Sequence, residues 1–220
     1  MKEFEHEPIR GLPEQLPEGE RILWQGRPSW RGLALGAFRM REVAAYFAAL
    51  GVGKALYAAI GGASAGIVAL EFIGMAAPAV LALAVLAGLA RLCERSTVYT
   101  ITNKRVVMRF GMALEKAVNL PFTAIAQAAA KIDANGRGDI ALTLEDKSRV
   151  SYVAFWPHVR PLRFSRAQPS LRGLNGANAV AAILATALAD AHGQSVAPQP
   201  APERAAVPRP VSQVSQPQPA

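Results

Sequence analysis

The chain has 220 residues, of which 51% are hydrophobic and 18% charged, so it has room for a membrane segment and one modest folded domain. Its single cysteine, Cys93, excludes a disulfide framework and a cysteine-rich metal site. The formal net charge is +8, but no zinc-finger, RNA-motif or recognition-helix pattern accompanies it, so nucleic acid is not an expected partner.

Residues 1–40 are expected to form a cytoplasmic N-terminal segment. Its first half is charged and rich in proline, which predicts an extended arm, and it contains no apolar stretch that could act as a secretory signal. Glu20–Trp24 is suitable for a short strand that stops in a turn at Gln25–Pro28, and Ser29–Met40 leads into the apolar region.

The region Val43–Ala90 contains only two charged residues, Lys54 and Glu71. As a continuous helix it would extend for about 72 Å, whereas the hydrocarbon core of a bilayer is about 30 Å thick. We therefore predict a transmembrane helical hairpin over residues 41–91, with spans at Arg41–Ile60 and Ile67–Arg91 and a glycine-rich turn at Gly61–Gly66. A buried pair of soluble helices is the alternative.

Two features inside this hairpin each allow two interpretations. Lys54 and Glu71 lie at matching depths on either side of the turn, so they either pair across the hairpin or reach the outer interface independently. Gly62 and Gly66 also match the spacing of a small-residue helix-packing motif, although the turn is the preferred interpretation.

After the second span the pattern changes to the alternation of β-strands. Ser96–Thr102 and Arg105–Gly111 predict a β-hairpin with a turn at Asn103-Lys104. Four further strands are expected, at Ala113–Leu120, Ile125–Ile132, Asp139–Leu144 and Arg149–Phe155. Together they predict a small antiparallel sheet or barrel within a domain of residues 92–192.

The rest of the chain is predicted to be loop, helix and tail. Three prolines in Trp156–Gly173 predict a loop. Asn175–Ala191 has apolar residues near helical spacing, which predicts an amphipathic helix capping the β-domain, with a third membrane span as the alternative. Residues 193–220 are rich in Pro and Gln and are expected to be disordered.

One segment combines aromatic and basic side chains, namely Tyr152–Phe164. It predicts either a surface that contacts a partner or lipid headgroups, or a sheet edge and loop held over the core by Trp156. The candidate contact residues are those of this segment and the basic residues after the second span: Trp156, His158, Arg160, Arg163, Arg91, Arg95, Lys104 and Arg105.

No pattern of residues indicates catalysis or a bound cofactor. Two of the three histidines, His6, His158 and His192, lie in segments expected to be mobile, and there is no Ser-His-Asp arrangement, phosphate loop or dinucleotide glycine pattern. We therefore expect a protein that is not an enzyme and that uses neither a cofactor nor a metal.

Several separate motifs carry a family resemblance. The segments Leu16–Pro28 and Tyr99–Val107, placed on either side of a helical pair, resemble the bacterial pleckstrin-homology-like (PH-like) domain class. Four shorter motifs are more narrowly similar to the PuhB family of photosynthetic complex assembly proteins of purple bacteria: Arg10–Pro13, Asn119–Phe122, Gly138–Ile140 and Trp156–Pro161.

The resemblance implies an α+β membrane protein, with a two-helix transmembrane hairpin and a small antiparallel PH-like β-barrel closed by a C-terminal helix. It also implies a non-enzymatic factor that promotes assembly of the photosynthetic reaction centre with its core light-harvesting antenna. The expected partners are subunits of those complexes, other assembly factors, an anionic lipid surface or a second copy of the chain. The rival hypothesis is a lipid-binding adaptor.

The expected location is the bacterial inner (intracytoplasmic) membrane, with both termini in the cytoplasm. Arginines flank both spans on the side of the termini, whereas the turn between Lys54 and Glu71 carries no charge. Positively charged flanks remain in the cytoplasm, which gives this orientation.

Overall fold

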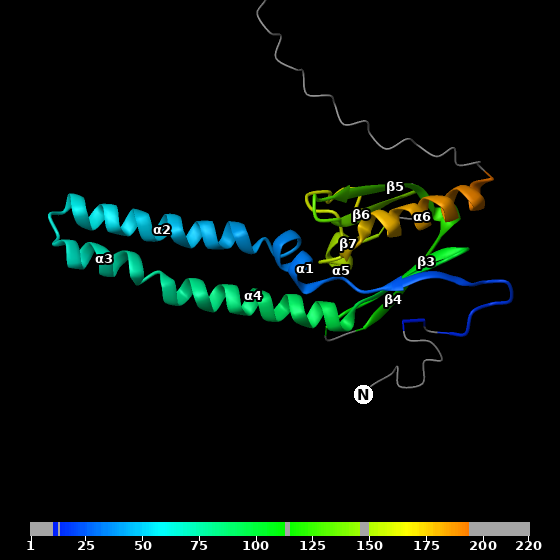
Figure 1. Ribbon diagram of the computed structural model, residues 1–220, viewed down its shortest axis with the longest axis horizontal. Helices are drawn as coiled ribbons and strands as arrows, with labels where there is room; N and C mark the ends of the chain where they lie inside the picture. The colour runs from blue at the N-terminus through cyan, green and yellow to red at the C-terminus, as the bar shows by residue number, and fades with distance from the viewer. Residues whose placement is uncertain (1–10, 13, 113–114, 146–149, 194–220) are drawn as a thin grey trace, which may run out of the picture.

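The computed structural model describes residues 11–12, 14–112, 115–145 and 150–193, and the statements below concern these residues. The predicted extended arm lies partly, and the predicted disordered tail almost wholly, outside them. Figure 1 shows two parts, a long helical hairpin and a β-domain at its base.

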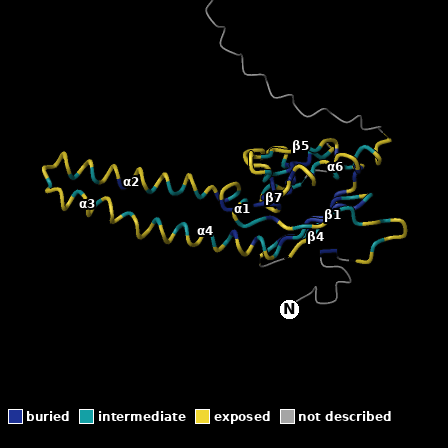
Figure 2. The backbone as a smooth tube through the Cα atoms, viewed as in Figure 1, coloured by how far each residue is buried: buried dark blue, intermediate teal, exposed yellow. Residues whose placement is uncertain are grey.

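The hairpin consists of α2 (Met40–Ile60), followed by α3 (Ala65–Ile73) and α4 (Ala76–Ser96). Met40–Ile60 and Ala65–Ser96 are long and apolar enough to cross a membrane, and only 6% and 0% of their most apolar windows are buried. Figure 2 shows this exposure along both arms. The low burial argues against a soluble pair of core helices.

The second arm differs from the single helix predicted at Ile67–Arg91. It is interrupted at Gly74-Met75, and α4 continues past Arg91 to Ser96. Pro78 explains the interruption because it has no backbone N–H to donate to the carbonyl of Gly74, four residues earlier. The predicted turn is present between α2 and α3, where Gly62 has a φ of +77° that favours glycine.

A short helix that the sequence did not reveal connects the two parts. α1 (Trp30–Gly36) begins at Ser29, whose Oγ accepts a hydrogen bond from Gly32 N at 3.1 Å. Its buried side chains pack on α4 in a small apolar cluster of Leu33, Ala34, Phe38, Ala90 and Cys93. Seven residues are too few to show helical periodicity in the sequence.

The β-domain contains two antiparallel sheets. In the first, of order β1-β2-β3-β4, the strands are Ile22–Gly26, Val98–Thr102, Arg105–Phe110 and Lys116–Pro121. A short 3-10 helix, η1 (Phe122–Ala124), leads to the second sheet, of order β5-β6-β7, with strands Ile125–Ile132, Arg137–Leu144 and Ser170–Asn175. The apolar core lies between the sheets, as the predicted antiparallel β-domain requires.

Three strand predictions need correction. β1 is displaced by two residues, so Gln25 and Gly26 lie in the strand instead of a turn. The predicted strand Arg149–Phe155 is wrong in its described part, where Tyr152–Phe155 forms a helical turn, α5. β7 lies in the segment predicted to be a loop. This strand is buried on both faces, but Arg172 and Gly173 interrupt its apolar residues, so the sequence does not show a strand pattern.

The C-terminal helix packs as predicted. α6 (Ala177–His192) contacts β5, β6 and η1, with Val180, Leu184 and Ala187 buried. This packing accounts for its apolar face and favours the capping helix over a third span.

The N-terminal segment is not separate from the β-domain. β1 forms the edge of the first sheet by pairing with β2, and α1 packs on β7. The predicted boundaries at residues 40 and 92 therefore divide parts that fold together, and a fragment starting at residue 92 lacks an edge strand.

Candidate functional site

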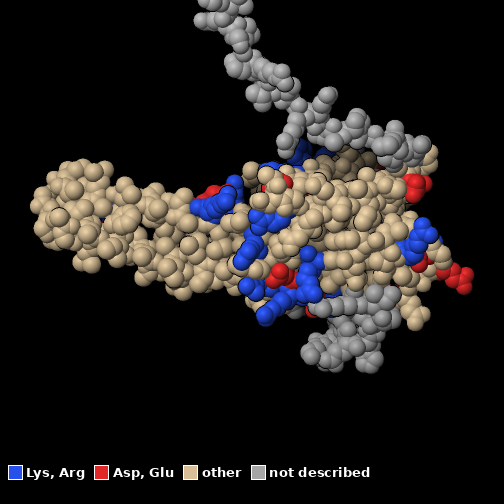
Figure 3. Space-filling model, viewed as in Figure 1, with Lys and Arg blue, Asp and Glu red and all other residues tan. Residues whose placement is uncertain are grey.

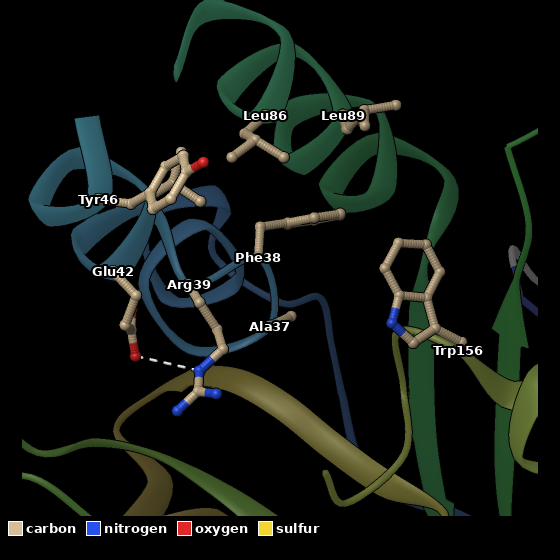
Figure 4. Close-up of a pocket in the computed structure, with 9 residues that line it drawn as sticks. Ala37, Phe38, Arg39, Glu42, Tyr46, Leu86, Leu89 and Trp156 are labelled. Carbon is tan, nitrogen blue, oxygen red and sulfur yellow. Dashed lines mark hydrogen bonds and ion pairs between the residues drawn. The ribbon is translucent and has the colours of Figure 1, made fainter. Parts of the chain in front are cut away.

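A groove lies at the base of the hairpin, where α2, α4 and the loop after α5 meet. Its volume is about 510 Å³, and most of its lining is apolar. Figure 4 shows the rings of Phe38, Tyr46 and Trp156 and two leucines of α4 facing this space. The lining residues are Ala37, Phe38, Arg39, Glu42, Val43, Tyr46, Leu86, Leu89 and Trp156.

The corner between α1 and α2 shapes this groove. Arg39 has a φ of +51° and a ψ of +43°, a left-handed conformation that is uncommon for a residue with a side chain. On one side of it, Phe38 turns inward, 7% exposed, and makes an edge-on contact with Trp156 at 5.5 Å between ring centroids. The side chain of Arg39 itself pairs with α2, where its Nε lies 3.0 Å from Glu42 Oε1.

Arginines and a tryptophan surround the same end of the hairpin. The guanidinium carbon of Arg91 lies 4.4 Å from the ring centroid of Trp30, and that of Arg31 lies 5.5 Å from it. Trp30 N donates to Glu94 Oε1 at 3.1 Å. Basic side chains gather at this junction in Figure 3. Aromatic and basic residues at the end of apolar helices are typical of a membrane–water interface.

His158 is not a surface contact residue, which corrects the prediction. It is 1% exposed, its Nδ1 lies 2.6 Å from Tyr99 Oη, and its Nε2 lies 3.2 Å from Thr97 Oγ1. Burial is the main cause that lowers its pKa to about 3, and the nearby positive charge of Arg172 lowers it further. The imidazole is therefore neutral and joins α5's loop to β2.

A partly buried ion pair, which the sequence did not indicate, lies next to His158. Arg172 Nε donates to Asp139 Oδ2 at 3.2 Å, and its Nη1 donates to Pro157 O at 3.3 Å. Asp139 Oδ1 also accepts from Gly173 N at 2.8 Å. Asp139 belongs to the family motif Gly138–Ile140, but no local pattern in the sequence indicates its partner on β7.

The remaining predicted contact residues do not form one surface. Arg91 and Arg95 lie in the last turns of α4, whereas Lys104 and Arg105 lie beyond the far end of β2, a five-residue strand about 17 Å long. Arg105 Nε pairs with Glu20 Oε1 at 2.8 Å. Arg160 and Arg163 are exposed, and Arg160 Nη1 donates to Gln168 Oε1 at 3.2 Å.

The structure brings Lys54 and Glu71 together across the hairpin. Lys54 Nζ lies 2.7 Å from Glu71 Oε2, with side-chain exposures of 49% and 40%. The pair borders a second groove of about 580 Å³ between α2 and α3.

This contact predicts the outcome of a charge swap. Lys54→Glu and Glu71→Lys should each lower the amount of the protein several-fold, because two like charges would face each other on two apolar helices. The double swap should restore the amount, which quantitative immunoblotting of cells would measure. A double variant as scarce as the single ones would show that the pair does not act as a unit.

The described residues offer little for metal binding, since no group of three or more His, Cys, Asp or Glu among them could hold an ion.

Comparisons with known proteins agree with this architecture. The chain matches the family model of the bacterial PH domain over residues 43–186, from the first turn of α2 into α6. It is 39% identical over 189 residues to a Rhodobacter capsulatus protein named "uncharacterized 23.7 kDa protein in puhA 5′ region", which covers 84% of this chain and 87% of that protein. No solved structure matches the chain.

Proposed function

The chain belongs to the bacterial PH domain family, and from this premise we propose that it is a non-enzymatic, membrane-anchored assembly factor for the photosynthetic reaction centre and its core light-harvesting complex. The observation that carries the proposal is the large unburied apolar surface of the hairpin, joined directly to a compact β-domain. Such a molecule can hold a partner within the bilayer and at its surface. The motifs shared with photosynthetic assembly proteins, and a relative named for the puhA 5′ region, point to the kind of partner.

In this proposal the hairpin crosses the membrane twice. α2 has 21 residues, or about 31 Å of helix, which equals the thickness of the hydrocarbon core. The arginines and Trp30 at its base then lie at the cytoplasmic interface, and the turn at residues 61–64 lies on the opposite side.

Within the bilayer, α4 offers the better surface for a partner helix. Ala77, Ala84 and Gly88 lie on one face of α4 and are exposed, so another helix can approach closely. On α2, in contrast, Gly51 is buried, and a methyl group there would lie 3.1 Å from the ring of Phe72. The corresponding face of α2 is therefore partly used inside the hairpin.

The orientation can be measured with enzyme fusions. Alkaline phosphatase fused after Ser64 should be active, because positively charged flanks hold both ends of the hairpin in the cytoplasm and place the turn outside. A fusion after Lys116 should be inactive. Activity after Lys116 and none after Ser64 would overturn the orientation.

The function itself predicts the effect of removing the gene. Deletion should lower the levels of the reaction centre and core antenna several-fold while pigment synthesis continues, since the proposal gives the chain a role in assembly and none in making pigment. Absorption spectra and immunoblots of membranes would measure both, and a plasmid copy provides the control. Normal levels of both complexes in the deletion strain would contradict the assembly role and favour the lipid-binding adaptor.

A further inference from the structure

We propose that the groove at the base of the hairpin binds one phospholipid molecule with a zwitterionic, amine-bearing headgroup. The inference rests on the membrane placement proposed above but not on any photosynthetic partner. It assigns a ligand to a groove formed by α2, α4 and Trp156, outside the two sheets of the β-domain.

The distribution of polarity along the groove matches a lipid. Its ion pair, Arg39 and Glu42, lies at the end near the β-domain, whereas Tyr46 and Leu86 lie one to two helical turns farther along the hairpin. Figure 4 shows Arg39 and Glu42 on one side, with the rings and the leucines on the other. A headgroup at the polar end would place an acyl chain along the apolar part, toward the interior of the bilayer.

The size and exposure of the groove suit an acyl chain. Its volume of about 510 Å³ lies within the range of roughly 300–1,000 Å³ typical of small-molecule sites. Trp156 is 47% exposed and Tyr46 60% exposed, although both are large side chains that gain from contact with apolar groups. An acyl chain would cover the faces of both.

The charges at the polar end favour a zwitterionic headgroup. The Arg39 guanidinium suits a phosphate, and the adjacent Glu42 carboxylate suits an ammonium group. The side chains are 65% and 54% exposed, and such exposed ion pairs contribute little to stability, so a headgroup can replace their mutual contact at little cost. The hydroxyl groups of phosphatidylglycerol can donate hydrogen bonds to Glu42, but that headgroup carries no cation to pair with the carboxylate.

The backbone at Arg39 supports a built site. A left-handed conformation is unfavourable at a residue with a side chain and persists where the surrounding structure requires it. Here it sends Phe38 into the groove wall and Arg39 to its edge. Both parts of the proposed lipid contact therefore depend on this one residue.

Native mass spectrometry of the full-length chain in detergent, titrated with phosphatidylethanolamine or phosphatidylglycerol, tests the proposal. The chain should retain one phosphatidylethanolamine molecule, at least 5-fold more tightly than phosphatidylglycerol. Val43→Trp, which fills the groove, should weaken retention at least 10-fold, and Leu86→Trp should act alike from α4. Val52→Trp, on an exposed part of α2 outside the groove, is the matched control and should bind as the unaltered chain does.

The headgroup assignment has its own variant. Glu42→Gln should remove the preference for phosphatidylethanolamine while leaving acyl-chain binding in place. Equal retention in Val43→Trp and Val52→Trp, equal binding of the two lipids by the unaltered chain, or a photo-cross-linker at position 43 that captures a protein instead of lipid in membranes would each overturn the proposal. Because these measurements use the isolated chain or its immediate neighbours, they can fail while the deletion phenotype holds, and the reverse.

Discussion

Lowering the pH from 7 to 5 should reduce the free energy of unfolding of the β-domain by about 2 kcal/mol through His158 alone. The folded domain keeps this imidazole neutral until the pH approaches its lowered pKa of about 3. The unfolded chain protonates it below about pH 6.5. Between these values the unfolded state binds more protons, so stability falls steadily as the pH falls through this window.

The full-length chain in detergent is unfolded with denaturant at several pH values, and pulse proteolysis measures the unfolded fraction at each denaturant concentration. His158→Gln is the control, because it retains a polar side chain that does not titrate. The difference in pH slope between the two proteins isolates His158 from the carboxylates. Parallel slopes between pH 7 and pH 5 would show that His158 is not buried as described.

Asp139→Ala should have a still larger effect, lowering the free energy of unfolding by about 3 kcal/mol at pH 7. The change leaves Arg172, 6% exposed, without its carboxylate, and it removes the acceptor for Gly173 N. An uncompensated buried charge is among the most destabilising single changes.

Two further variants serve as controls for Asp139→Ala. Asp190→Ala removes an exposed carboxylate from α6 and should change stability by less than about 0.5 kcal/mol. Asp139→Asn keeps an acceptor for Gly173 N and should fall between the other two. If Asp139→Ala unfolds at the same denaturant concentration as Asp190→Ala, the ion pair between Arg172 and Asp139 does not stabilise the domain.

The sequence revealed those elements whose pattern is local. The two arms of the hairpin are apolar over more than a bilayer's thickness, and β2 and β3 are rich in β-branched and aromatic residues, so a window along the chain contains their signal. The turn between α2 and α3 follows from its glycines.

What the sequence concealed depends on contacts between distant residues. β7 has no alternation because the chain crosses the interior with both faces covered, and Arg172 in its middle is tolerated only because Asp139 lies on the neighbouring strand. His158 lies in a segment of tryptophan, proline and arginine that resembles a surface loop, yet its ring is buried and hydrogen-bonds with Tyr99 and Thr97. The groove joins residues 37–46 to residues 86, 89 and 156, which no local pattern connects.

The junction between α4 and the first sheet couples the orientation of the hairpin to that of the β-domain. Only Thr97 separates the end of α4 from β2, and that residue is 1% exposed with its hydroxyl 3.2 Å from His158. Because this one-residue connection is short and buried, a tilt of α4 rotates the β-domain with it. A tilt of about 10° would swing the far end of β2, about 17 Å away, by about 3 Å. Any partner that changes the tilt of α4 would thereby change the orientation of the whole β-domain.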